Sequence, residues 1–105
     1  METRRQINMI RVAARTNPNA LAEGLLRAVN ETGRVRLRAV GAAAINQMVK
    51  AIAIGRAELL RIGADLNCAP MFSDVFIDGS VKSAISIDVE LRYLSESRSE
   101  YRPAA

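Results

Sequence analysis

The chain has 105 residues and a net charge of +4; half of its residues are apolar and 4% are aromatic. This length suits one small domain with a modest core, and the scarcity of aromatic residues argues against a base-stacking platform of several rings. The absence of histidine, with Cys68 as sole cysteine, excludes an intrachain disulfide, imidazole catalysis and a zinc site. Cys68 lies beside apolar residues, so we expect it to be a small buried hydrophobe.

The first part of the chain predicts a strand, a helix and a second strand. Residues 7–13 are rich in β-branched and apolar residues, which favours a strand. In the segment that follows, Asn17 suits the N-cap of a helix and Gly33 suits its left-handed stop. Residues 34–40 alternate arginine with apolar residues, and this period of two predicts the second strand.

A second helix is predicted over residues 42–62, ending near Gly63. Its apolar residues spread over about half of the helical wheel, whereas packing on a sheet needs a stripe of only about 100°. The excess apolar surface favours contact with a second copy of the chain. The alternative is a helix wedged between the sheet and the first helix.

The rest of the chain predicts a β-hairpin and a tail. Residues 65–77 form a third strand, and Pro70 within it indicates an edge strand or a bulge. Asp78-Gly79 is a two-residue hairpin turn, and apolar residues alternate with polar ones from Ile85 to Tyr93 in the fourth strand. Residues 95–105 are polar, and we expect a disordered tail.

The predicted order is β-α-β-α-β-β. Right-handed crossovers place both helices on the same face of one sheet, which leaves the other face open. We therefore expect an α/β fold, a two-layer sandwich of a four-stranded mixed sheet and two helices, over residues 7–94, preceded by a flexible head, residues 1–6. No signal peptide and no apolar run of membrane-spanning length are found, so we expect a cytoplasmic protein without membrane contact.

Catalytic and cofactor motifs are missing from the sequence. No Ser-His-Asp or Cys-His set exists without histidine, and the acids show no metal-ligand spacing. The segment "GAAAIN" has one glycine and lacks the fuller patterns of nucleotide-binding loops. We therefore expect a protein that is not an enzyme and that has no catalytic residues, no cofactor and no metal.

Binding of a polyanion is better supported. Residues 1–61 carry eleven Lys or Arg against four acids, and residues 62–105 carry four against seven. The loops "ARTNPN" and "VGAA" are expected at one end of the sheet, where helix N-termini present N–H groups to anions. The candidate phosphate-binding residues are Arg15, Asn17, Asn19, Asn46 and Lys50.

Arg56 lies in the middle of the apolar arc of the second helix. An unpaired arginine is costly to bury, so its charge must meet a partner or reach solvent. Three interpretations stay open: pairing across an interface, contact with a ligand phosphate, or a side chain that reaches water near the helix end. Taken as a ligand contact, Arg56 joins the candidate nucleic-acid-binding residues.

The stretch "VGAAAINQMVKAIAIGR" resembles the central signature of the stage V sporulation protein S family. Further matches are "NPNALA" at the first helix, "CAPMFSD" in the third strand and the closing "AISIDVELR". The resemblance covers roughly residues 7 to 92. It puts forward Asn46, Lys50 and Arg56, with Arg15 and Asn17 from the first loop.

The resemblance implies an Alba-like fold, homodimers or higher homo-oligomers, nucleic-acid binding, and a role in spore development or cell-division control. It also implies that the second and fourth strands are neighbours, so that Asp88 and Glu90 partly neutralise Arg34, Arg36 and Arg38. Alba proteins that bind DNA typically use a long basic hairpin in the minor groove. The hairpin "IDGSVK" is predicted to be short and has only Lys82 nearby, which argues against groove insertion.

We therefore predict a small regulatory protein that binds DNA or RNA mainly through phosphates. The alternative is a protein-interaction adaptor that oligomerises through its second helix and does not bind nucleic acid. A weaker third possibility is a small-molecule sensor that uses a pocket between the loops.

Overall fold

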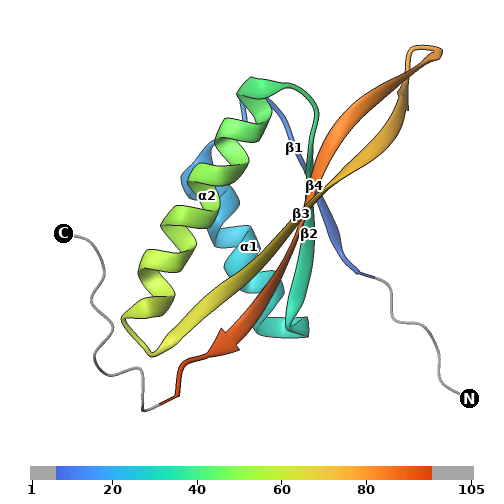
Figure 1. The fold of residues 1–105 in the computed structure, drawn as a ribbon. Coiled ribbons are helices and arrows are strands. Elements are labelled where there is room, and N and C mark those ends of the chain that lie inside the picture. Colours follow the sequence, from blue (N-terminus) through green and yellow to red (C-terminus); the bar gives the residue numbers. More distant parts are fainter. Residues whose placement is uncertain (1–6, 96–105) are drawn as a thin grey trace, which may run out of the picture.

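The computed structural model describes residues 7–95, which form two layers, with two helices covering one face of a sheet (Figure 1). The elements are β1 (Met9–Val12), α1 (Pro18–Thr32), β2 (Arg34–Ala39), α2 (Ala42–Leu60), β3 (Ala64–Ile77) and β4 (Ser80–Tyr93). The predicted element order and two-layer α/β sandwich are confirmed. The head predicted for residues 1–6, and all but the first residue of the tail predicted for 95–105, lie outside the described residues.

The four strands form one mixed sheet in the order β1-β2-β4-β3. β1 and β2 are parallel, and β4 is antiparallel to both of its neighbours, β2 and β3. β2 and β4 are therefore adjacent, as the resemblance implied. β3 is an edge strand, as Pro70 predicted, and it stays continuous through that residue.

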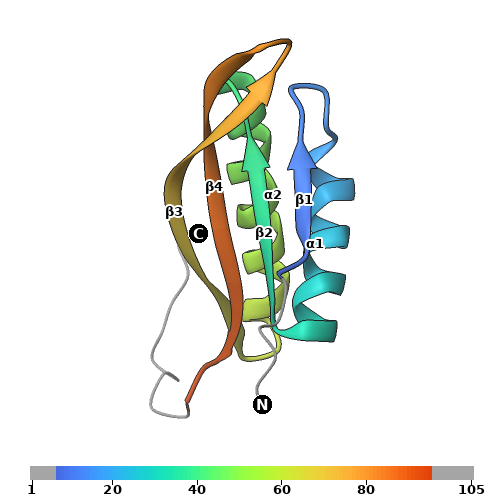
Figure 2. The same ribbon diagram turned by 90° about the vertical axis from the view of Figure 1, so that its right-hand side faces the viewer.

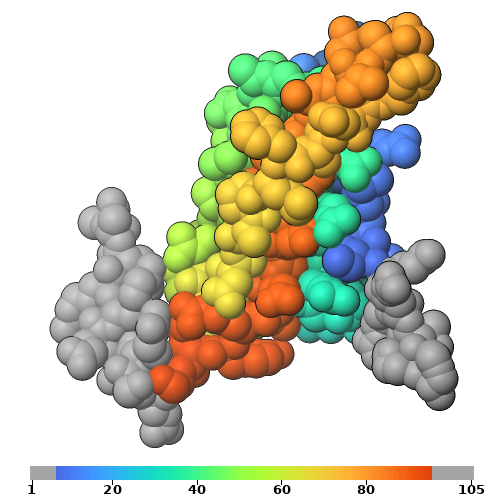
Figure 3. All heavy atoms as spheres, turned by 45° about the vertical axis from the view of Figure 1, so that its right-hand side comes forward, coloured from blue at the N-terminus to red at the C-terminus, as the bar shows by residue number. Residues whose placement is uncertain are grey.

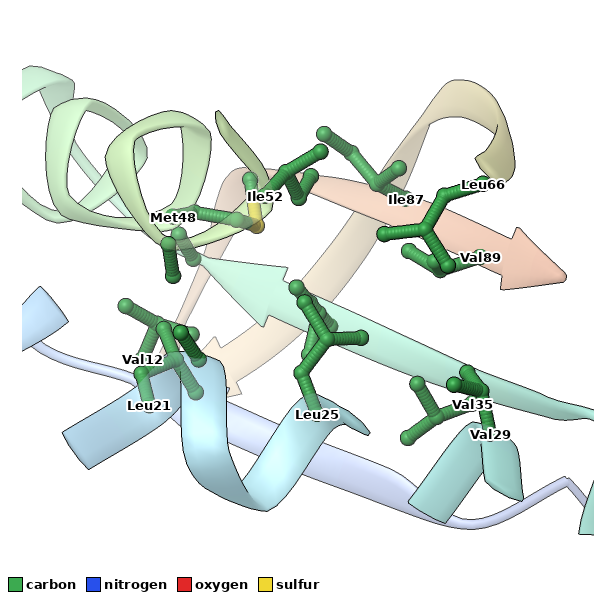
Figure 4. Packing of buried hydrophobic residues seen from close by; sticks show 14 of the residues in the cluster. Val12, Leu21, Leu25, Val29, Val35, Met48, Ile52, Leu66, Ile87 and Val89 are labelled. Carbon is green, nitrogen blue, oxygen red and sulfur yellow. The ribbon is translucent and has the colours of Figure 1, made fainter. Parts of the chain in front are cut away.

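The core lies between the sheet and the helices. α1 begins where predicted, since the Asn17 side chain accepts hydrogen bonds from two backbone N–H groups, and it ends at Gly33, whose φ is 90°. Figure 4 shows side chains from both helices and from β1, β2, β3 and β4 meeting in one apolar cluster. Its fully buried members include Leu25 and Met48, and burial of one such side chain stabilises the fold by roughly 1.5–3 kcal/mol.

α2 ends at Leu60, two residues before the predicted end, and packs on both α1 and the sheet. At Gly55 the two helices come close, because a Cβ at this position would lie 3.4 Å from a methyl carbon of Leu26. The contact with α1 accounts for part of the wide apolar arc. It does not account for Val49, which is 51% exposed.

The hairpin differs most from its prediction. Its turn is the predicted Asp78-Gly79, and both residues have positive φ, 51° and 80°, as a type I′ turn requires. The hairpin itself is long rather than short, because β3 and β4 are 14 residues each and β4 begins at Ser80. In Figures 1 and 3 it projects past the ends of β1 and β2, away from the helices.

The hairpin arm is apolar and acidic rather than basic. Met71, Phe72, Phe76, Ile77 and Val81 are exposed on it. Asp74 and Asp78 are its acids and Lys82 is its cation between residues 69 and 86. Although the hairpin is longer than predicted, it therefore lacks the basic residues that insertion into a DNA groove would need.

Cys68 is exposed, so the prediction that it is buried was wrong. Its register partner on β4, Val89, is fully buried, but β3 lies at the edge of the sheet. The residues that follow Leu66 on β3 as far as Phe72 are all exposed. A sequence pattern cannot show that the helix layer ends before it covers the edge strand.

Candidate functional site

The two strand-to-helix loops lie at one end of the sheet. Because β1 and β2 are parallel, their carboxyl ends share an edge, and residues 13–17 and 40–41 lie there (Figure 2). The hairpin tip points to the same end. The prediction that these two loops lie at one end of the sheet is therefore confirmed.

The first loop is a compact turn that is tied to α2. Thr16 Oγ1 accepts a hydrogen bond from the Ala13 backbone N–H at 2.8 Å, and the Thr16 N–H donates to the Ala13 carbonyl at 3.0 Å. The Gln47 side-chain amide donates to the Thr16 carbonyl at 2.8 Å. Gln47 thus positions the loop that carries Arg15. Gln47 stands next to Asn46 in the family signature, which was the signal for it in the sequence. Its role in positioning the loop was not predictable from the sequence, because that role depends on the tertiary contact with Thr16.

The two helix N-termini differ in the donors they offer to an anion. At α1, the N–H groups of Asn19 and Ala20 bond to Asn17 Oδ1, at 2.8 and 3.2 Å, and Pro18 has none. The α1 terminus is therefore already satisfied by its own cap. α2 begins after Gly41, which makes no side-chain cap bond, so the first N–H groups of α2 are available to an anion.

Three predicted residues are free to meet a ligand. Arg15, Asn46 and Lys50 are exposed, and their side chains have no hydrogen-bond or ion-pair partner among residues 7–95. Asn46 and Lys50 are one helical turn apart on α2, on the same face. Arg15 stands on the loop that Gln47 holds against this same helix.

Arg56 lies away from that group. It is ten residues past Asn46, about 15 Å along the helix at 1.5 Å per residue. Its guanidinium pairs with Asp65 at the start of β3, through Nε–Oδ1 and Nη2–Oδ2 contacts of 2.7 and 3.0 Å. This bidentate bond holds the pKa of Asp65 below its usual value, against the opposing effect of burial. None of the three interpretations of Arg56 named this partner: the guanidinium pairs with a carboxylate of the same chain.

The arginines of β2 are neutralised unevenly. Arg36 forms a bidentate ion pair with Asp88, at 2.6 and 3.0 Å, and these hydrogen bonds lower the pKa of Asp88. Arg34 lies opposite Glu90 in the register. Arg38 lies opposite Ser86 and donates to its hydroxyl at 3.3 Å, with no carboxylate opposite it. Positive charge therefore persists at the end of β2 that adjoins the loops.

No group of three or more His, Cys, Asp and Glu in this part of the chain, residues 7–95, is arranged to hold a metal ion. No helix within residues 7–95 is both long enough and apolar enough to cross a membrane.

Comparison with known proteins supports the family and the fold. The family model described as Stage V sporulation protein S (SpoVS) matches residues 8–92. Among solved structures, the chain is similar to "Alba from Thermoplasma volcanium", with a TM-score of 0.55 and 16% identity. That similarity covers 80% of this chain and 98% of the other, and at this identity it shows the fold alone.

Proposed function

This chain belongs to the stage V sporulation protein S family and has an Alba-like fold, and from this we propose that it is a cytoplasmic, non-enzymatic regulator that binds nucleic acid. Its role would lie in bacterial development or cell-division control. The observation that carries the proposal is unpaired positive charge at one end of the sheet. Arg15 is exposed on the first loop, and Lys50 is exposed on α2 about 12 Å, at 1.5 Å per residue, from the uncapped N-terminus of that helix.

Phosphates would be the main contacts. Lysine and arginine supply charge, while Asn46 and the first N–H groups of α2 supply directional hydrogen bonds. Such binding is weakly selective for sequence and weakens as salt increases. Asn17 and Arg56 already hold a helix cap and an ion pair, and a further contact from them to nucleic acid stays a prediction.

The proposal is tested by fluorescence anisotropy with a labelled mixed-sequence oligonucleotide at low and moderate salt. Reversal of charge in the double variant Arg15→Glu, Lys50→Glu should weaken binding by tenfold or more and flatten its salt dependence. Arg61→Glu is the matched control. It reverses one charge rather than two, on an exposed residue just past the other end of α2, and it should weaken binding far less than Arg15→Glu or Lys50→Glu does alone.

Two outcomes would contradict the proposal. If the double variant binds as tightly as Arg61→Glu, the loop surface is not the binding site. If the unaltered protein shows no salt-dependent signal at tens of micromolar, nucleic-acid binding is wrong and the adaptor is favoured. The apolar, acidic hairpin is the observation that supports that second candidate.

We also propose that the protein is a homodimer or higher homo-oligomer. Arg56 reaches β3, so Val49, seven residues earlier on the same face of α2, borders the gap between α2 and β3. Phe72 pairs in register with Ile85, which packs on the core, so Phe72 faces the helix side of the sheet at that gap. Phe72 is 78% exposed, and a second copy would bury it.

Sedimentation equilibrium tests this arrangement. Phe72→Glu should shift the protein towards monomer, because a charge would be buried in the interface. Tyr93→Glu places the same charge on an equally large exposed aromatic position at the end of β4. Equal behaviour of the two variants would place the interface elsewhere.

A further inference from the structure

A pocket lies between the hairpin and the open face of the sheet. In Figure 2 the last part of β3 crosses in front of β4, so that its end leans towards β2 and β1. The pocket has a volume of about 670 Å³, within the range of small-molecule sites. Ala84 and Ser86 lie on the open face outside the core cluster, yet they are only 2% and 1% exposed. The open face is therefore covered, rather than flat, where the hairpin leaves the sheet.

Two arginines of the open face line this pocket. Arg11 and Arg38 are register partners on the parallel strands β1 and β2, so they lie side by side, with strands about 4.8 Å apart. Like charges at such positions repel each other, and an anion between them relieves the repulsion. Arg11 has no hydrogen-bond or ion-pair partner within residues 7–95. The two side chains therefore favour a bound anion.

Two serine hydroxyls orient Arg38. Its Nε donates to Ser86 Oγ at 3.3 Å, and Ser86 Oγ lies 3.0 Å from Ser73 Oγ on β3. The terminal nitrogens of Arg38 form no hydrogen bond within the described residues. Their N–H groups form a fork that matches the oxygens of a carboxylate or a phosphate. Arg38 is thus held by one nitrogen and has the others available to a ligand.

The hairpin adds an aliphatic side to the pocket. Met71 on β3 lies opposite Ser86, which lies opposite Arg38, so Met71 is on the same face of the sheet as the arginines. Val75 and Ile77 follow Met71 at even spacing along an uninterrupted register, so they share this face. Both residues line the pocket. Aliphatic side chains therefore lie on the face that the hairpin turns towards the arginines.

The other lining residues agree with this assignment. Val40, which follows β2, adds a third aliphatic residue. Asp74 and Phe76 also border the pocket, but strand alternation places their side chains on the other face of the hairpin. The site therefore combines two guanidinium groups with aliphatic walls, a few polar groups in a mainly apolar lining.

We propose that this pocket binds a small aliphatic compound that carries a carboxylate or a phosphate group. The anionic group lies between Arg11 and Arg38, and the aliphatic part lies against Val40, Val75 and Ile77. A phosphate monoester has close to two negative charges at neutral pH, which match the two guanidinium groups, whereas a carboxylate has one. The inference does not rest on the proposed function, because such a ligand is not a polynucleotide.

NMR titration of the full ¹⁵N-labelled chain with ethyl, butyl and hexyl phosphate tests the site. Each added methylene should tighten binding about two- to fourfold, because it is buried against the aliphatic wall. The amide signals of residues 11–14, 38–40 and 75–77 should shift. Inorganic phosphate and hexanol each supply one half of the ligand, and both should bind at least about tenfold more weakly than hexyl phosphate.

Two variants test the two sides of the pocket. Arg38→Gln should weaken the binding of hexyl phosphate about tenfold, because it removes charged hydrogen bonds. Val75→Ser should weaken it about fivefold and leave the binding of inorganic phosphate unchanged, because it removes only aliphatic contact. Neither residue belongs to the core cluster, so both variants should keep the native spectrum.

Each variant has a matched control. Arg34→Gln removes the same charge from the same face at the far end of β2. Val81→Ser makes the same substitution on the other face of the hairpin, where Val81 lies opposite Phe76. Both controls should leave the affinity for hexyl phosphate within about twofold of that of the unaltered protein.

The possible results separate the proposal from its alternatives. Affinity that does not increase with chain length, or a loss in Val75→Ser no larger than in Val81→Ser, would overturn the aliphatic side. Equal effects of Arg38→Gln and Arg34→Gln, or equal binding of hexanol and hexyl phosphate, would overturn the anion site. Comparison of hexanoate with hexyl phosphate assigns the anionic group to whichever binds more tightly. Because no polynucleotide is used, these results do not depend on whether the chain binds nucleic acid.

Discussion

Replacement of Arg56 with alanine is expected to destabilise the protein by about 2 kcal/mol. The substitution removes two charged hydrogen bonds, of 2.7 and 3.0 Å, from a carboxylate whose side chain is only 7% exposed. Removal of one partner from a buried ion pair can cost roughly 3–5 kcal/mol. The Arg56 side chain is 43% exposed and screened by water, and Asp65 keeps its bond to the Leu66 N–H. We therefore expect a loss of about 2 kcal/mol, below the range for a fully buried pair.

Thermal unfolding measures this loss. About 2 kcal/mol corresponds to a fall in Tm of roughly 8–16 °C for a domain of this size. Arg61→Ala is the control, because Arg61 is exposed, at the end of the same helix, and its side chain has no partner among the described residues. If Arg56→Ala lowers Tm no further than Arg61→Ala does, the ion pair contributes nothing to the fold.

The pH dependence of stability tests whether the loss comes from the ion pair between Arg56 and Asp65. In the unaltered chain Arg56 lowers the pKa of Asp65, so the stabilisation is present above the unfolded pKa of about 3.9 and is lost as pH falls through the lower folded pKa. Without Arg56, burial of the Asp65 side chain opposes its ionisation, so the variant is destabilised while Asp65 is charged and recovers stability when Asp65 is protonated. The stability difference between the two proteins should therefore be largest near pH 7 and shrink below pH 4. A difference that is constant with pH would contradict the electrostatic explanation.

Two further substitutions test local features at the loop end. Gly41 has φ 92° and ψ 154°, a conformation adopted almost only by glycine. Gly41→Ala should therefore destabilise the protein by about 1–3 kcal/mol, although the added Cβ would meet nothing within 4 Å. A loss of less than about 0.5 kcal/mol in urea denaturation would contradict this prediction. Gln47→Ala removes the bond to Thr16 and should lower stability by about 1 kcal/mol and nucleic-acid affinity severalfold. Asn46→Ala, its neighbour, should lower affinity with no loss of stability, and equal stability losses would show that Gln47 does not hold the loop.

The elements whose ends depend on local chemistry were predictable. Asn17 caps α1 and Gly33 ends it because the required hydrogen bonds and positive φ are properties of those residues themselves. Asp78-Gly79 forms the hairpin turn for the same reason. The ends that depend on packing were predicted less well: α2 stops two residues early, and β4 begins at Ser80 because it continues to pair with β3 beyond the body of the sheet.

The candidate site likewise has one part that the sequence predicts and another that depends on tertiary packing. The parallel order of β1 and β2, which the sequence pattern predicts, places both strand-to-helix loops at one end of the sheet. The bond between Gln47 and Thr16 joins residues 31 positions apart, so it arises only from tertiary packing.

The distribution of acids on β4 explains why uncompensated positive charge on the open face lies at one end of the molecule. Glu90, Asp88 and Ser86 lie opposite Arg34, Arg36 and Arg38 in turn, so negative charge on β4 stops one position before β2 reaches the loops. The middle of the open face is therefore compensated by the Arg36–Asp88 pair, and a polyanion gains little there. Beyond it, Arg38 has no carboxylate opposite it, and its charge adds to those of Arg11, its register partner on β1, and Arg15 on the loop that follows β1. An acid at position 86 would extend the compensation to Arg38, and for that reason Ser86→Asp should weaken the binding of a polyanion at this end of the molecule.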